Sequence, residues 1–409
     1  MKKGWKTETL EEVCQFSNGL WKGEKPPFVK VGVIRNTNFT KEGTLDDSDI
    51  AYLDVEAKKL EKRRLQFGDI ILEKSGGGPK QPVGRVALFE KEEGSFSFSN
   101  FTAALRVLNS RELDFRFLHK FLHWTYVSGV TEGMQSHSTG IRNLDGDAYK
   151  AIKISFPPLG EQQRIVGVLD EAFDGLVTAQ ANADKNLQNA RALFESYRQS
   201  VFTRRGNGWV EKPFSELCDI KHGYAFEGEF FSNEGDYVLL TPGNFYEKGG
   251  YRDRGEKQKY YTGDIPRDYV LGKGDLLVAM TEQAAGLLGS PIVVPESDKF
   301  LHNQRLGLVI KKHGIPWTNE FFFHVFNTQQ VRKEIHASAS GVKVRHTSPT
   351  KIGKVLVAFP PVAEQKQIVA KLDALATESQ RLEEIYSQKQ AALAALKKSL
   401  LHQAFSGQL

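Results

Sequence analysis

Two stretches of this sequence, Phe156-Pro-Pro-Leu-Gly-Glu-Gln-Gln-Arg-Ile-Val166 and Phe359-Pro-Pro-Val-Ala-Glu-Gln-Lys-Gln-Ile-Val369, are near copies of one another. In each copy, two prolines stand directly before about 40 residues that contain no further proline and little glycine. Proline fits the first turn of a helix and interrupts its interior, so each pair marks the start of a long helix. Two such starts in one chain also predict a tandem repeat.

The rest of the two halves matches in the same order. The segment from Trp5 to Cys14 corresponds to the segment from Trp209 to Cys218, with Trp, Glu and Cys in equal positions. Gly68-Asp69 and Gly274-Asp275 each form a turn that leads into an apolar strand. The similarity is uneven, which indicates a retained scaffold that carries divergent loops.

The length and the repeat predict two domains of the mixed α/β (α+β) class, each followed by a long helix. Residues 20–66 and 224–270 share little beyond this class. We predict a first domain at residues 1–156 and a first helix at 157–204. A second domain at 205–359 and a second helix at 360–409 follow.

Apolar residues recur along both predicted helices with spacings that alternate between three and four, the heptad pattern of a coiled coil. The predicted seam comprises Ile165, Leu169, Leu176, Leu187, Phe194, Ile368, Leu372, Leu375, Leu382, Leu393, Leu396 and Leu400. We expect the helices to pack antiparallel against each other, with a pseudo-two-fold axis, because one domain cannot bury so long a seam. The alternative is that each helix covers only its own domain. Gly167 and Gly175 weaken the first helix by roughly 1 kcal/mol each, which close helix packing or a partner would explain.

The composition is typical of a soluble globular protein. Hydrophobic residues make up 40% and charged residues 26% of the chain, and no apolar run reaches the roughly 18 residues of a membrane-spanning helix. The N-terminus resembles no secretory signal, so we expect a cytoplasmic protein. The net charge of +5 is compatible with nucleic acid but does not require it.

The sequence predicts no catalytic residue and no metal site. Cys14 and Cys218 have no partners at zinc-ligand spacing and are expected to be buried apolar residues. The glycine-rich segment Lys74–Lys80 lacks the ending of a phosphate-binding loop and is expected to be a flexible loop between strands. His119 and His123 lie in an aromatic helix, where core packing is the better interpretation. Neither Phe-Pro-Pro stretch has the Asn or Asp that precedes Pro-Pro in amino-methyltransferases.

The divergent loops offer many hydrogen-bond donors. Arg and Lys neutralise phosphates and reach guanine, and Gln pairs with adenine, so the loops as a set favour DNA binding. For any single residue, a solvated surface side chain is the commoner role. The candidates are Arg63, Arg64, Lys74, Ser75, Lys80, Arg85, Thr139, Arg142, Arg252, Arg254, Lys257, Gln283, Gln304, Lys343, Arg345 and His346.

The repeat, the two Pro-Pro-x-x-Glu-Gln helix starts, the heptad helices and the final Ala404-Phe-Ser-Gly-Gln-Leu409 closely resemble the specificity subunits of Type I restriction-modification systems. The resemblance implies two target-recognition domains on an antiparallel coiled-coil spacer, each reading one half of a bipartite, asymmetric double-stranded DNA site. It also implies two methyltransferase subunits, which bind S-adenosylmethionine, and motor-nuclease restriction subunits as partners. The chain itself would hold no cofactor and catalyse nothing. Two alternatives are a two-armed protein-binding scaffold and a restriction enzyme fragment with its own active site.

Overall fold

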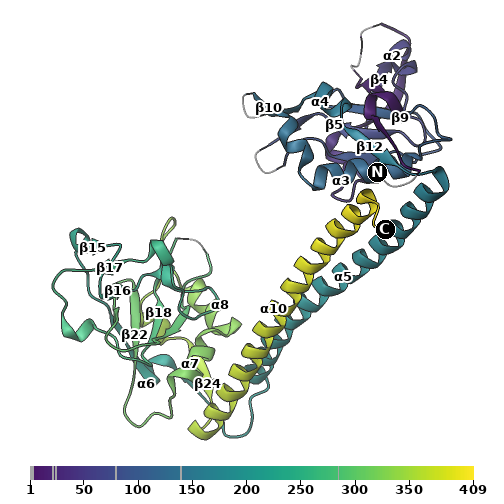
Figure 1. The fold of residues 1–409 in the computed structure, drawn as a ribbon. Coiled ribbons are helices and arrows are strands. Elements are labelled where there is room, and N and C mark those ends of the chain that lie inside the picture. Colours follow the sequence, from purple (N-terminus) through teal and green to yellow (C-terminus); the bar gives the residue numbers. More distant parts are fainter. Residues whose placement is uncertain (1–3, 21–22, 24, 79–80, 139–140, 284) are drawn as a thin grey trace. The chain divides into compact units, whose positions relative to one another are not determined.

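The computed structural model describes residues 4–20, 23, 25–78, 81–138, 141–283 and 285–409 (Figure 1). It divides into two compact units, Met1–Asp184 with Ser387–Leu409, and Lys185–Tyr386. Each unit contains one globular domain, the start of the long helix that follows this domain, and the end of the other long helix.

The first domain alternates short strands and helices and leads into the first long helix. Its elements are β1 (Lys6–Thr9), α1 (Leu10–Val13), β2 (Cys14–Asn18), β3 (Phe28–Ile34), η1 (Asn36–Asn38), β4 (Ala51–Glu56), α2 (Ala57–Glu61), β5 (Ile70–Glu73), β6 (Ser75–Gly77), β7 (Val86–Leu88), β8 (Phe96–Phe98), β9 (Thr102–Val107), α3 (Phe115–Val127), η2 (Val130–Met134), β10 (Gln135–Ser138), β11 (Ile141–Leu144), α4 (Gly146–Lys150), β12 (Lys153–Phe156) and α5 (Leu159–Thr203).

The second domain has a similar succession. Its elements are β13 (Val210–Pro213), α6 (Phe214–Leu217), β14 (Cys218–His222), η3 (Gly228–Phe230), β15 (Phe231–Ser232), β16 (Tyr237–Leu239), η4 (Pro242–Asn244), η5 (Gly255–Lys257), β17 (Tyr260–Tyr261), η6 (Arg267–Tyr269), β18 (Leu276–Ala279), β19 (Thr281–Glu282), β20 (Pro291–Val293), β21 (Phe300–Leu301), β22 (Leu306–Lys311), α7 (Asn319–Phe326), α8 (Gln329–Ala337), β23 (Arg345–His346), α9 (Pro349–Gly353), β24 (Leu356–Phe359) and α10 (Val362–Ser406).

The main sheet has the same strand order in both domains. A four-stranded antiparallel sheet has the order β2-β9-β5-β7 in the first domain and β14-β22-β18-β20 in the second. A second sheet contains one parallel pair in each domain, β3 with β8 and β16 with β21. The repeat therefore extends through residues 20–66 and 224–270, where the sequences share little.

The turn before each central strand explains the repeated Gly-Asp pair. Gly68 and Gly274 have φ angles of 88° and 90°, which favour glycine. The next residue closes the turn, because Oδ2 of Asp69 accepts from the backbone N of Gln66 at 2.8 Å. The strand β5 that follows is buried along its whole length, which places the turn at the edge of the core.

A buried glutamine explains the first Pro-Pro-x-x-Glu-Gln stretch. The side chain of Gln162 is 0% exposed. Its Nε2 group donates to the backbone oxygens of Glu112 and Pro157, both at 2.7 Å. Its Oε1 atom accepts from the backbone N of Asp114 at 2.8 Å, and Asp114 is the N-cap of α3. The glutamine therefore fastens the start of α5 to the start of the main helix of the domain.

The second copy of the stretch forms the same clamp. Gln365 is also 0% exposed, and its Nε2 group donates to the oxygens of Pro316 and Pro360 at 2.7 and 2.8 Å. Its Oε1 atom accepts from the backbone N of Thr318, the N-cap of α7, at 3.1 Å. We refer to these two residues as the glutamine clamps.

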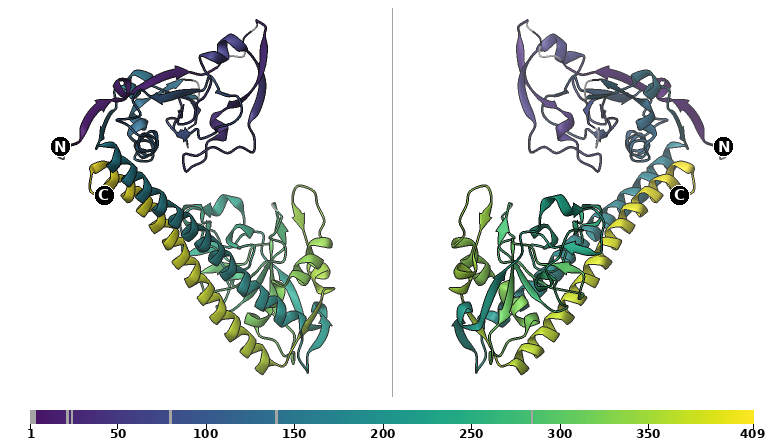
Figure 2. Two further views of the ribbon diagram at one scale, coloured as in Figure 1. Left: turned by 90° about the vertical axis from the view of Figure 1, so that its right-hand side faces the viewer. Right: turned by 90° about the vertical axis from the view of Figure 1, so that its left-hand side faces the viewer.

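The long helices α5 and α10 lie side by side and antiparallel within each unit (Figures 1 and 2). Residue numbers rise along α5 as they fall along α10. The contacting pairs in the first unit are Arg164 with Leu409, Phe173 with Lys397 and Asp184 with Gln390. Those in the second unit are Arg191 with Glu383 and Tyr197 with Lys371. The expected antiparallel packing is confirmed within each unit.

Burial varies among the residues of the predicted seam, and one leucine of this set is exposed. Ile165, Leu169 and Leu372 are buried, whereas Leu396 is 47% exposed. The neighbouring Lys397 is half-buried instead, with its amine 5.2 Å from the ring centre of Phe173. An α-helix has 3.6 residues per turn, so a straight helix drifts out of a strict seven-residue pattern.

The two glycines of α5 are not explained by close helix packing. Apart from its chain neighbours and the nearby backbone of α5, a Cβ atom built on Gly167 or Gly175 would have no heavy atom of the described residues within 4 Å.

Candidate nucleic-acid interface

Ser75 and Arg142, two candidate residues of the first unit, lie in the three-stranded sheet β10-β11-β6, and Lys74 directly precedes β6. The expectation of a flexible loop at Lys74–Lys80 is wrong for Ser75–Gly77, which form β6. A Cβ atom on Gly77 would lie 2.6 Å from the oxygen of Gln81, so glycine permits a close approach of two backbone segments. The Ser75 hydroxyl donates to Oδ1 of Asn143 on β11 at 2.6 Å, which ties the two strands together.

Two of the predicted cations converge on the end of β2. The Lys74 amine donates to Oδ1 of Asn18 at 2.9 Å, and Nε of Arg63 donates to the backbone oxygen of the same residue at 3.2 Å. Burial lowers the pKa of Lys74. Arg64 is exposed, and Arg142 on β11 donates to Oε1 of Gln135 at 3.3 Å. The structure therefore brings Lys74, Ser75 and Arg142 to one sheet; Lys80 and Thr139 lie outside the described residues.

Arg85 is held inside the domain. Its guanidinium forms two hydrogen bonds with the buried carboxylate of Glu73, at 2.8 and 3.0 Å. It also donates to the backbone oxygens of Asn36 and Phe39. A cavity of about 410 Å³ opens beside this ion pair and is lined in part by Gly76–Gly78. These contacts favour a role for Arg85 in shaping the surface, while its direct contact with DNA stays a prediction.

In the second unit, β19 and β23 form a small antiparallel sheet that follows the core strand β18, as β6 follows β5. Gln283, Lys343 and His346 are exposed around it. Arg345 is half-buried and bonded within the domain, because its guanidinium lies 3.2 Å from a carboxylate oxygen of Glu282. Gln304 is exposed as well, on the turn before β22.

The remaining three candidates lie in the segment after η4, and Lys257 is the last residue of η5. The Arg252 guanidinium lies 5.9 Å from the ring centre of the exposed Tyr246. Arg254 packs on the face of Gly243, where a Cβ atom would lie 2.9 Å from its Nη1 atom. Lys257 is exposed.

Two buried asparagines that sequence reasoning missed shape this loop and its counterpart in the first unit. Oδ1 of Asn38 accepts from the backbone N of Arg35, and Oδ1 of Asn244 accepts from that of Thr241, each at 2.9 Å. Both asparagines are almost fully buried. The available signal was an Asn-Phe pair at the same spacing before each Gly-Asp turn.

The cysteines and the paired histidines occupy the core, as predicted. Cys14 and Cys218 are buried, and burial raises the pKa of both thiols to about 12. His119 and His123 are buried too, and burial lowers the pKa of His119 to about 3 and that of His123 to about 4. Among the described residues, no three His, Cys, Asp or Glu side chains gather as metal ligands. No described helix is long and apolar enough to cross a membrane.

Both halves of the chain match one known family. Residues 2–186 and residues 206–387 each match the family described as Type I restriction modification DNA specificity domain. The chain belongs to this DNA specificity family.

Relatives in the DNA specificity family cover either half or nearly all of the chain. The EcoBI specificity subunit of Escherichia coli is 28% identical over 50% of this chain, and the match spans 40% of that subunit. The StySPI specificity subunit of Salmonella potsdam is 23% identical over 100% of this chain and 89% of its own length. The EcoKI specificity subunit of Escherichia coli K12 is 22% identical over 94% of this chain and 82% of its own length.

Two solved structures share the fold of this member of the DNA specificity family. A chain from work described as the structural basis of complex assembly and conformational transition of the type I R-M system has a TM-score of 0.76. It is 18% identical, and the match covers 99% of this chain and 98% of that one. The HsdS subunit from Thermoanaerobacter tengcongensis has a TM-score of 0.66 at 18% identity, covering 100% and 98%. Both structural similarities confirm the predicted fold.

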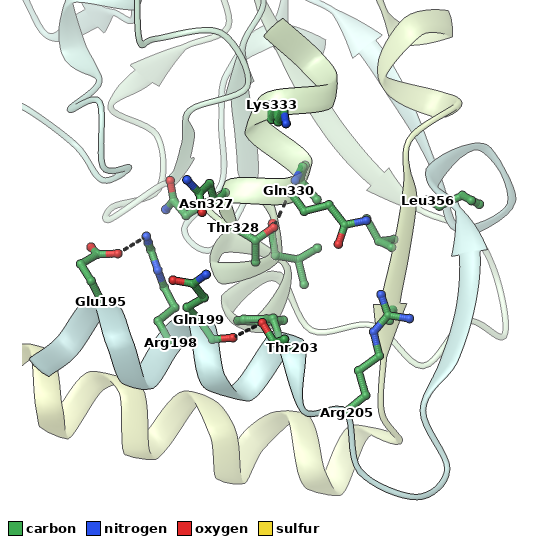
Figure 3. Close-up of a pocket in the computed structure, with 16 residues that line it drawn as sticks. Glu195, Arg198, Gln199, Thr203, Arg205, Asn327, Thr328, Gln330, Lys333 and Leu356 are labelled. Carbon is green, nitrogen blue, oxygen red and sulfur yellow. Dashed lines mark hydrogen bonds and ion pairs between the residues drawn. The ribbon is translucent and has the colours of Figure 1, made fainter. Parts of the chain in front are cut away.

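A cavity of about 800 Å³ lies in the second unit of this DNA specificity protein (Figure 3). It is lined by the end of α5, by α8 and by β24. Arg198 on its wall pairs with Glu195 of the same helix, and the Thr203 hydroxyl donates to the backbone oxygen of Gln199 at 2.7 Å. None of the described residues that line this cavity is a predicted DNA candidate. The cavity therefore belongs to the scaffold and not to the candidate interface.

Proposed function

We propose that this chain is the subunit that gives a Type I restriction-modification complex its DNA sequence specificity. Each domain reads one half of a bipartite, asymmetric double-stranded DNA site. The observation that carries the proposal is where the two halves of the chain differ in sequence. The strand order of the four-stranded sheets, the Gly-Asp turns and the glutamine clamps repeat, whereas residues 20–66 and 224–270 share little sequence. The loops around β6, β11, β19 and β23 carry different donors in the two domains.

The chemistry of these loops suits DNA. Exposed side chains such as Gln283, Lys343 and His346 can donate to base edges and phosphates. Phosphate contacts make such binding strongly salt-dependent. A two-armed protein-binding scaffold, the second candidate, predicts no salt-dependent DNA affinity of the assembled complex.

The helices supply a spacer and a surface for partners. The 45 residues of α5 correspond to about 67 Å of helix at 1.5 Å per residue. We propose that the paired helices set the gap between the half-sites and that two methyltransferase subunits dock on the scaffold. These subunits bind S-adenosylmethionine, and motor-nuclease restriction subunits join them for cleavage. This chain holds no cofactor and does no chemistry, and the complex acts in the cytoplasm.

A domain exchange tests the proposal. Residues 20–135 are replaced by those of another specificity protein of this family, and the chain is assembled with its methyltransferase subunits. Mapping the methylated bases should give two short motifs around a fixed gap, with only one motif altered by the exchange. Changes in both motifs would contradict independent domains, and DNA methylation without any bipartite motif would contradict the proposal as a whole.

A further inference from the structure

A buried carboxylate holds the candidate loop that follows β19. The side chain of Glu282 is 2% exposed. Its Oε2 atom accepts from the backbone N–H groups of Gly286, Leu287 and Leu288 at 2.9, 2.9 and 3.1 Å. One oxygen atom therefore binds three consecutive N–H groups shortly after the exposed Gln283.

The second oxygen of the same carboxylate holds β23. Oε1 of Glu282 lies 3.2 Å from Nη1 of Arg345 and 3.6 Å from Nδ1 of His336. Nη2 of Arg345 donates in addition to the backbone oxygen of His336 at 2.6 Å. Glu282 thereby joins three segments that are separate in the chain: the loop after β19, the strand β23 and the end of α8. A buried charge of this kind is stable only while its partners remain in place.

The first unit has a buried carboxylate in a comparable place. Glu73 is 1% exposed and is the last residue of β5, separated from β6 by Lys74. It forms the ion pair with Arg85 and accepts from Nδ2 of Asn36 at 3.2 Å. A Cβ atom on Gly76 would lie 2.9 Å from that same Nδ2 atom, so β6 rests directly on this network.

We propose that Glu282 and Glu73 are positioning residues for half-site recognition. Each fixes the shape of one candidate loop, while exposed neighbours such as Gln283 contact the DNA. Arg345 and Arg85 act as the counter-charges of these carboxylates and do not bind phosphates. The inference rests on the proposed DNA-reading function and adds residues that determine specificity without contacting a base.

The test uses Glu282→Gln in the full chain, assembled with its methyltransferase subunits. The substitution keeps the size of the side chain and removes the charge that holds Arg345 and the three N–H groups. Methylation of DNA with one mismatch in the half-site read by the second domain should rise about tenfold relative to the intact site, because discrimination at one base pair is worth about 1–3 kcal/mol. The other half-site should keep its preference. Glu73→Gln should give the opposite pattern.

Glu296→Gln is the matched control. It removes the carboxylate of a surface ion pair with Lys299 in the same domain and should leave both preferences unchanged. Amide hydrogen exchange of β18 and β22 should stay as in the wild type for both variants. Two results for Glu282→Gln would overturn the inference. One is an equal loss of methylation at intact and mismatched sites, and the other is a weaker sequence preference at both half-sites. A wild-type complex without any bipartite motif would instead overturn the proposed function itself.

Arg345→Gln provides a second test should Glu282→Gln fail to fold. A weaker sequence preference of Arg345→Gln at the same half-site, with an unchanged salt dependence of DNA binding, supports the role of Arg345 as the counter-charge of Glu282. A slope of log K against log salt that falls by about one would show that Arg345 binds a phosphate and would overturn its assigned role.

Discussion

The glutamine clamp of the first unit allows a quantitative test of how the long helix is attached. Gln162→Glu keeps the size of the side chain and replaces its Nε2 donor by an oxygen. The backbone oxygens of Glu112 and Pro157, each 2.7 Å from that donor, would then face another acceptor. A buried polar group without a partner costs about 1–3 kcal/mol, and more beside a charge. With two such oxygens, we expect the first unit to lose about 3–5 kcal/mol of unfolding free energy.

Amide hydrogen exchange read by mass spectrometry resolves the effect along the full chain. Peptides that cover α3 and the start of α5 should lose protection, whereas peptides that cover α7 should not. Gln163→Glu is the control, because this neighbouring glutamine is exposed and the same chemical change there should cost less than about 0.5 kcal/mol. A loss below about 1 kcal/mol in Gln162→Glu, or an equal loss in the control, would refute the clamp.

Two further predictions concern the spacer and acidic pH. Removing residues 176–182 from α5 together with residues 390–396 from α10 shortens the paired helices by about 10 Å. The gap between the methylated half-sites should then shrink by about three base pairs, and an unchanged gap would contradict the role of the helices as a spacer. Burial, with Lys397 and Lys120 acting in the same direction, lowers the pKa of His123 to about 4 from an ordinary value of 6.5. The unfolded chain binds this proton more readily, so the stability conferred by the neutral ring is present above pH 6.5 and is lost as the pH falls towards 4. In urea unfolding series, His123→Gln should show a smaller loss over that range, by up to about 1.4 kcal/mol per pH unit, and equal slopes would count against a buried neutral ring.

The architecture could be predicted from the sequence wherever one residue type dictates the backbone. The Pro-Pro pairs mark the long helices, and the Gly-Asp turns mark the central strands. The strand at Ser75–Gly77 escaped prediction because three glycines in a row have little strand preference, and pairing with β11 supplies what the local sequence lacks. Leu396 was misplaced because a strict heptad was extended along a helix whose true period is 3.6 residues.

The candidate interface was less predictable than the fold. A sequence displays charges but not their partners, so Arg85 and Arg345 looked like Lys343, although each is bonded to a buried carboxylate. The glutamine clamps were visible as a repeated pattern, yet each clamp also depends on a backbone oxygen far away in the chain, that of Glu112 or that of Pro316. Which exposed side chains touch bases stays a prediction.

Each unit combines one domain with the start of its own long helix and the end of the other. Two identical chains of half the length could therefore supply the parts of both units, in the manner of a homodimer. A symmetric dimer of that kind is restricted to palindromes, since every mutation appears twice. Joining the halves into one polypeptide removes this restriction. A mutation in one loop then alters one half-site alone, so evolution can change one half of the recognised sequence while the other domain stays the same.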